Sequence, residues 1–99
     1  MKVTINSVKF KTDKKLEEFI SEKVQKLTTN YNDIIGSEVI LKLENNENLE
    51  NKVTEIRLMI PGNDLFAKKI SKSFEESTDQ AIDALKKQLI KHKDKLRGI

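Results

Sequence analysis

A run of basic side chains near the end of the sequence has the spacing to contact phosphates. It contains a single acid, Asp94, among six basic residues, which are Lys86, Lys87, Lys91, Lys93, Lys95 and Arg97. At about 100° per residue of helix, Lys87, Lys91 and Lys95 lie within about 80° of one another, and the other three form a flanking stripe. Contacts of this kind supply affinity for phosphates without reading sequence. The run therefore indicates binding to a polyanion.

Two more lysines, Lys23 and Lys26, lie beside the apolar face of an earlier expected helix, although Glu22 dilutes their charge. If the two helices pack side by side on a sheet, both sets of lysines join in one surface. A structured RNA fits such a surface better than a short DNA motif, because the surface senses shape and backbone. The alternative is a solvated helix whose basic end suits the negative pole of its own dipole. The net charge of +3 does not decide between them.

The inventory of reactive side chains is poor for catalysis. The chain has one histidine, no cysteine and three glycines, which form no nucleotide-binding pattern. His92 lies on the apolar line of the last expected helix, where a packing role at the helix edge is favoured over a metal site. Asp79 and Asp83 share a face in the expected first turns of that helix, where the helix dipole explains them. We therefore expect no catalytic residue, no metal site and no cofactor, and a protein that is not an enzyme.

Length and composition exclude further classes. Ninety-nine residues make a single domain, expected to span 1–99. The sequence has no run of about 18 apolar residues and no signal-peptide block, so we expect a cytoplasmic protein without a membrane association. Without cysteine, stability depends on packing alone. The aromatic residues fall mostly on core-like positions, which argues against a base-stacking sheet; they are Phe10, Phe19, Phe66, Phe74 and Tyr31.

Hydrophobic periodicity predicts four strands and two helices. The expected strands are Lys2–Phe10, with a bulge near Asn6-Ser7 where the alternation slips, Ser37–Glu44, Val53–Ile60 and Leu65–Ser73. A helix capped by Thr12 or Asp13 should run to about Thr29, and the last helix should be capped by Ser77 or Thr78. Pro61-Gly62, completed by Asn63-Asp64, should form a hairpin connection.

This order, β-α-β-β-β-α, predicts an α+β fold. A strand, helix and strand of one sheet make a crossover between parallel neighbours, and the tight connections that follow make the later strands antiparallel. We expect a four-stranded mixed sheet with both helices packed on one face, a layout shared with double-stranded-RNA-binding modules. The other face should keep Lys42, Glu55 and Arg57 toward water.

The last helix also resembles that of a known family, the ribosome hibernation promoting factors, also called the sigma-54 modulation protein or ribosome-associated inhibitor family. Residues 79–93 are similar to the family's acidic start, Ala-Ile-Asp core, basic-Gln-Leu segment and Lys-rich end, except that Gln80 stands where the family often has an aromatic residue. Pro61-Gly62 matches the family's hairpin. The first helix adds further matches, at Leu16, Phe19, Lys23, Lys26-Leu27 and Tyr31.

The resemblance implies binding to 16S rRNA of the small ribosomal subunit, in the channel between head and body. There the protein would block mRNA and tRNA sites and inactivate translation in stationary phase or stress. By matching positions, Lys23, Lys26, Lys87 and Lys91 would contact rRNA; the charge pattern alone adds Lys86, Lys93, Lys95 and Arg97. We expect the short form of the family, a monomer off the ribosome, which leaves ribosome dimerisation to a separate factor.

Two other functions remain open. A general double-stranded RNA-binding module would bind a plain RNA duplex as tightly as it binds ribosomes. A modulator of a transcription factor, which one family name suggests, would form a salt-insensitive complex with a protein alone.

Overall fold

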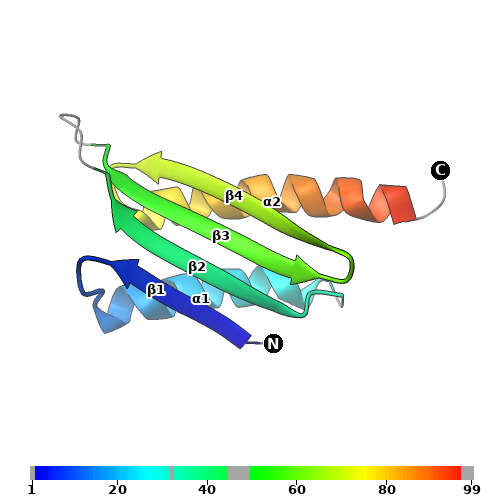
Figure 1. Ribbon diagram of the computed structural model, residues 1–99, viewed down its shortest axis with the longest axis horizontal. Helices are drawn as coiled ribbons and strands as arrows, with labels where there is room; N and C mark the ends of the chain where they lie inside the picture. The colour runs from blue at the N-terminus through cyan, green and yellow to red at the C-terminus, as the bar shows by residue number, and fades with distance from the viewer. Residues whose placement is uncertain (1, 32, 45–49, 97–99) are drawn as a thin grey trace.

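The computed structural model describes residues 2–31, 33–44 and 50–96, and over these ranges the elements follow in the predicted order (Figure 1). They are β1 (Lys2–Val8), α1 (Lys14–Thr29), β2 (Gly36–Leu43), β3 (Lys52–Ile60), β4 (Asn63–Ser71) and α2 (Phe74–Leu96). The sheet order is β1-β2-β3-β4, with β1 parallel to β2 and the later pairs antiparallel. The predicted mixed sheet is therefore confirmed.

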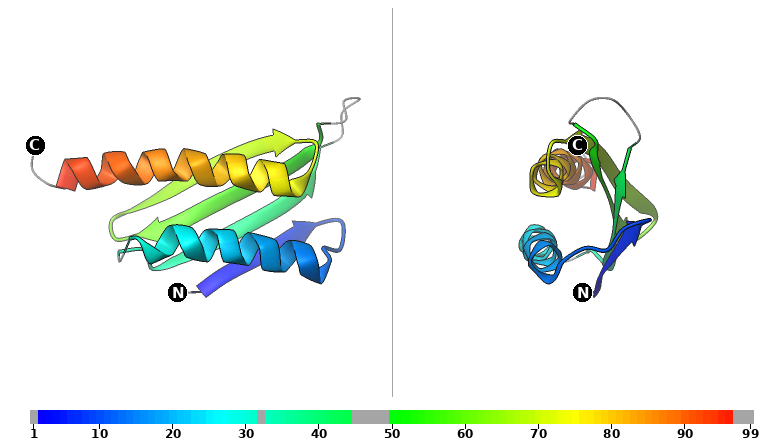
Figure 2. Two further views of the ribbon diagram at one scale, coloured as in Figure 1. Left: turned by 180° about the vertical axis from the view of Figure 1, so that it is seen from behind. Right: turned by 90° about the vertical axis from the view of Figure 1, so that its left-hand side faces the viewer.

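Both helices cover the same face of the sheet, as predicted. The helix α1 packs against β1 and α2, and α2 packs against β3 and β4. Figure 2 shows the two helices side by side on one side of the sheet, with the other side left open. Over the described residues the fold therefore has two layers, and no helix covers the other face of the sheet.

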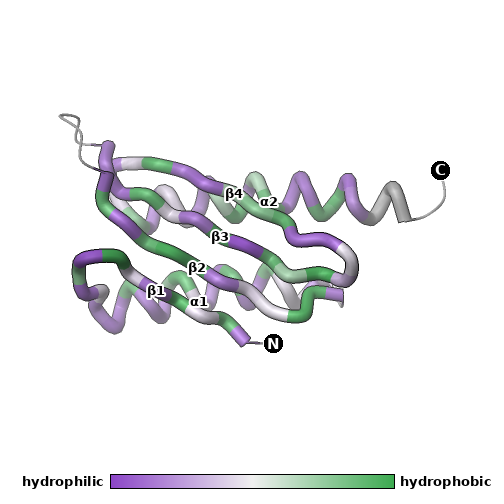
Figure 3. Tube along the Cα trace, viewed as in Figure 1, coloured by the Kyte–Doolittle hydropathy of each residue, from purple (hydrophilic) through white to green (hydrophobic). Residues whose placement is uncertain are grey.

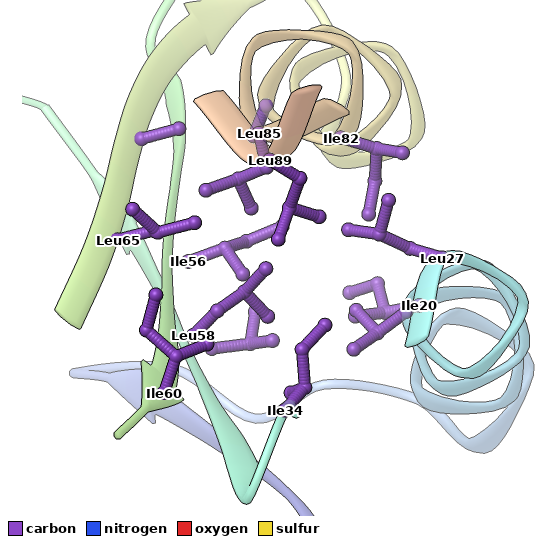
Figure 4. Packing of buried hydrophobic residues seen from close by; sticks show 14 of the residues in the cluster. Ile20, Leu27, Ile34, Ile56, Leu58, Ile60, Leu65, Ile82, Leu85 and Leu89 are labelled. Carbon is purple, nitrogen blue, oxygen red and sulfur yellow. The ribbon is translucent and has the colours of Figure 1, made fainter. Parts of the chain in front are cut away.

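The core lies between the sheet and the two helices. Alternate strand residues point into it while their neighbours point away, so polar and apolar colours alternate along the strands in Figure 3. Ile56 and Leu58 of β3 are fully buried and meet Ile20 of α1 and Leu85 of α2 (Figure 4). Burial of such a side chain stabilises the fold by about 1.5–3 kcal/mol. This shared core fixes the two helices side by side.

The predicted bulge in β1 is wrong. Pairing with β2 runs without interruption from Lys2 to Val8, and the strand then ends. Lys9 has φ 65°, a left-handed backbone conformation that turns the chain out of the sheet. The turn returns Phe10 to the core, where its ring stacks on Phe74 with the centroids 5.2 Å apart. The slip in the alternation marks the end of the strand.

The predicted cap of the last helix is also wrong. The helix α2 begins at Phe74, and Ser73 Oγ accepts a hydrogen bond from the Glu76 amide at 3.1 Å. Ser77 and Thr78 are buried inside the helix, where their hydroxyl oxygens lie 2.6 and 3.4 Å from Thr54 Oγ1. Serine and threonine occur both as helix caps and as buried residues that hydrogen-bond to another element. The start of this helix was therefore placed wrongly from the sequence.

The other predicted boundaries hold with small changes. Asp13 caps α1, because its Oδ1 accepts a hydrogen bond from the Leu16 amide at 2.7 Å. The hairpin turn is shorter than predicted: Ile60 pairs directly with Asn63, so Asn63-Asp64 belong to β4. Gly62 has φ 83°, which a glycine adopts without strain.

Candidate nucleic-acid interface

A groove runs between α1 and α2, and three of the predicted lysines line it. Lys23 and Lys26 come from α1 and Lys86 comes from α2. The groove has a volume of about 580 Å³, and its other lining residues are Leu27, Asn30, Asp79, Ile82 and Asp83. The helices adopt this arrangement because their apolar stripes share the core below, which leaves the polar flanks facing each other. The structure thus brings lysines of both helices together.

Lys23 is the most constrained of these lysines. Its Nζ lies 3.4 Å from Asp79 Oδ1 on the facing helix and 5.5 Å from the centre of the Phe19 ring. Both charged side chains of the ion pair are about half exposed, so the pair adds little stability. It does hold the Lys23 ammonium at the groove and offsets part of its charge.

A second hollow of about 410 Å³ lies on the other side of α2. It is lined by Lys87, the adjacent helix residues Gln80, Asp83 and Ala84, and Lys69 of β4. Lys69 is not among the lysines that the charge pattern of the sequence predicts. The alternation of β4 could have identified it. Lys69 follows Leu65 and Ala67 on the side of the strand that faces the helices, and a charged residue is tolerated there only at the edge of a sheet. Lys69 extends the basic surface from the helices onto the sheet.

The remaining predicted contacts lie toward the end of α2. Lys91 is exposed and follows Lys87 by four residues, so the two share a side of the helix. The helix backbone continues through Lys93 and Lys95. Their side chains, and the whole of Arg97, lie outside the described residues.

The only histidine of the chain lies at the edge of α2, as expected. His92 is mostly covered, and its Nε2 lies 3.6 Å from Asp33 Oδ2. Over the described ranges, no group of three or more metal-ligating side chains is close enough to hold an ion. Over the same ranges, neither helix is long and apolar enough to cross a membrane.

On the open face of the sheet, basic and acidic side chains form ion pairs with each other. Lys42 pairs with Glu55 at 2.6 Å, and Arg57 pairs with Glu38 at 2.8 Å. The predicted orientation of Lys42, Glu55 and Arg57 is therefore confirmed, although only 15% of the Glu55 side chain is exposed. Phe66 also lies on this face and is 50% exposed, so its expected core position is wrong. The charges beside it are paired, whereas Lys86, Lys87 and Lys91 follow one another in the second half of α2 with no acid between them.

Comparison with known proteins agrees with this fold. A family model described as "Sigma 54 modulation protein / S30EA ribosomal protein" matches residues 3–97. A ribosome hibernation promoting factor from Pseudomonas putida is 29% identical over 99 residues, which are 100% of this chain and 93% of that protein.

Two solved structures have the same fold at low sequence identity. A ribosomal subunit interface protein from Coxiella burnetii has a TM-score of 0.83 and 19% identity, over 95% of this chain and 99% of the other. The N-terminal domain of Thermus thermophilus Protein Y has a TM-score of 0.75 and 17% identity, and the match covers 89% of this chain and 94% of the other. Because the family model spans nearly the whole sequence, this chain belongs to the sigma 54 modulation protein / S30EA ribosomal protein family.

Proposed function

We propose that this protein is a ribosome hibernation factor that binds the small ribosomal subunit through the surface formed by α1 and α2. It acts in the cytoplasm, without catalysis, by occupying space that mRNA and tRNA need. Support comes from the family and from the name of the Pseudomonas putida relative. The observation that carries the proposal is the groove at which Lys23, Lys26 and Lys86 of two helices meet.

The proposed interface consists of the predicted lysines, the terminal arginine and the newly found strand lysine. Its members are Lys23, Lys26, Lys69, Lys86, Lys87, Lys91, Lys93, Lys95 and Arg97. Each ammonium or guanidinium group that contacts a phosphate of 16S rRNA releases condensed counterions, which gives affinity that falls with salt. Two rigid helices on one sheet present these charges in a fixed contour, and a fixed contour selects a folded RNA over a flexible one.

The test is binding of a Lys87→Ala/Lys91→Ala variant to purified small subunits, followed by sedimentation at several salt concentrations. We expect weaker binding, with the slope of log affinity against log salt reduced by roughly 1.5 because two phosphate contacts are lost. A matched control is Lys2→Ala/Lys68→Ala, which removes two exposed lysines from the open sheet side and should bind like the original protein. Unchanged binding of the first variant would refute the assignments.

The same assay separates the alternatives. A plain RNA duplex of matched length serves as competitor. If the duplex displaces the protein as efficiently as small subunits do, the function is general duplex binding. If the ribosome complex is absent and a salt-insensitive complex forms with a transcription factor, the protein-modulator function is correct.

A further inference from the structure

One carboxylate lies in the middle of the proposed cationic surface. Asp83 of α2 lines both hollows, with Lys26 and Lys86 on one side and Lys69 and Lys87 on the other. A negative charge at this point repels phosphates and weakens generic binding to a polyanion. Its presence therefore calls for an explanation other than phosphate contact.

The helix dipole does not supply that explanation. The dipole acts within the first turn of a helix, and α2 begins at Phe74, nine residues before Asp83. The earlier interpretation of Asp79 and Asp83 assumed a helix that begins near Ser77, and the observed start removes its basis. Glu75 and Glu76 occupy the first turn instead.

Asp83 makes no direct ion pair among the described residues, although Lys86 and Lys87 follow it by three and four positions in α2. Asp79 pairs with Lys23 across the groove, whereas Asp83 forms no ion pair or hydrogen bond with any residue that the structure describes. Its side chain is exposed. Both oxygens of this carboxylate are consequently free to accept hydrogen bonds from a ligand.

The groove beside Asp83 has the composition of a site for a flat, polar-edged group. Leu27 and Ile82 are buried and form its apolar lining, and Asn30 contributes an amide. Its volume is about 580 Å³, and its other lining side chains are polar or charged. Lysines at the rim can hold the phosphates on either side of such a group. A base taken out of its stack can be held between aromatic or apolar side chains and recognised by hydrogen bonds to its edge.

We propose that this groove receives an unpaired purine base of the bound RNA and that Asp83 reads its amino edge. Guanine fits best, because its N1–H and N2–H donors are parallel and match the two oxygens of a carboxylate. The inference rests on the proposed function and adds sequence specificity to a surface that otherwise contacts only phosphates. Asp83 is thus a specificity-determining residue, and the lysines around it supply affinity.

The test is an Asp83→Asn variant, which keeps the shape of the side chain and removes its charge. Binding to purified small subunits should fall about tenfold to a hundredfold, the range for loss of a charge-assisted hydrogen bond. Binding to a plain RNA duplex should stay the same or rise, because a repulsive charge is gone. Glu18→Gln, an exposed acid of α1 outside both hollows, is the matched control and should change neither.

Every other outcome overturns the proposal. Tighter or unchanged binding to both partners would mean that Asp83 only repels phosphates or plays no part, and an equal loss on both would indicate a general defect. If the unsubstituted protein does not bind small subunits at all, the proposed function fails first.

A second measurement is independent of the ribosome. Guanosine 5′-monophosphate should perturb the NMR amide signals of Leu27, Asn30 and Asp83 more than uridine 5′-monophosphate does, and Asp83→Asn should remove the difference. Equal perturbation by both nucleotides, or none in the groove, would contradict the base-reading role.

Discussion

Lys23 on α1 and Asp79 on α2 form an ion pair, with 3.4 Å between Nζ and Oδ1, across the groove proposed to bind rRNA. Because of this ion pair, Lys23 offers less net positive charge to a ligand than the other lysines of the groove do. To contact a phosphate, the Lys23 ammonium must either keep its ion pair with Asp79 at the same time or break that ion pair. Lys26 also lines the groove, and it forms no ion pair with any described residue.

This difference predicts unequal effects of two substitutions on one helix. Lys26→Ala should lower affinity for small subunits about threefold to tenfold, whereas Lys23→Ala should lower it about twofold or less, because Asp79 already offsets that charge. Sedimentation at one fixed salt concentration measures both. An effect of Lys23→Ala as large as that of Lys26→Ala would show that the ion pair does not persist on the ribosome.

Adjacent lysines on β4 provide a second comparison. Lys69 lines the hollow beside α2, while Lys68 pairs in register with Glu55 on the open face. Lys69→Ala should weaken binding and reduce the salt slope by about 0.8, the value for one phosphate contact. Lys68→Ala removes the same charge and should leave the slope unchanged. A salt slope that Lys69→Ala leaves unchanged would exclude Lys69 from the interface.

Removal of two buried hydroxyl groups, those of Thr54 and Ser37, should change the free energy of unfolding differently. Thr54 Oγ1 lies 2.6 Å from Ser77 Oγ, so Thr54→Val breaks a buried hydrogen bond and should lower the free energy of unfolding by about 1–3 kcal/mol. Ser37 Oγ is buried and finds no hydrogen-bond partner among the described residues. Ser37→Ala should leave the free energy of unfolding unchanged or raise it by about 1 kcal/mol. Urea unfolding measures both, and a large loss for Ser37→Ala would reveal a hidden partner.

Neighbouring residues of α2 test how the helix is held. Leu89 is 1% exposed and Ile90 is 55% exposed. Leu89→Ala should lower the free energy of unfolding by about 2–5 kcal/mol, because it opens a cavity between helix and sheet. Ile90→Ala should change it by less than about 0.5 kcal/mol. Thermal unfolding gives the comparison, and similar losses for the two would mean that the helix is rotated from the orientation described.

The fold was largely predictable because apolar periodicity is a local property. Alternation of Val39 and Leu41, and spacing of Ile20 and Val24, each identify an element without knowledge of its neighbours. The errors arose where a tertiary contact decides. The sequence predicts Ser77 or Thr78 as a cap, and only the position of Thr54 across the core explains why Ser77 is buried inside the helix.

The candidate site was predictable only in part for the same reason. Helical geometry places Lys87 and Lys91 on one side from the sequence alone. The pairing of Lys23 with Asp79 and the closeness of Lys69 to Lys87 depend on which strand and helix lie beside each other. Spacing along one element does not contain that information.

Site-directed photocrosslinking on the ribosome tests the orientation of the bound protein most directly. Ile90 of α2 and Phe66 of β4 are both about half exposed and apolar, and they lie on opposite faces of the fold. A benzophenone amino acid replaces one or the other, and the complex with small subunits is irradiated. We predict crosslinks to 16S rRNA from position 90 and none from position 66. Crosslinks from position 66 alone would contradict the proposed helix-face interface.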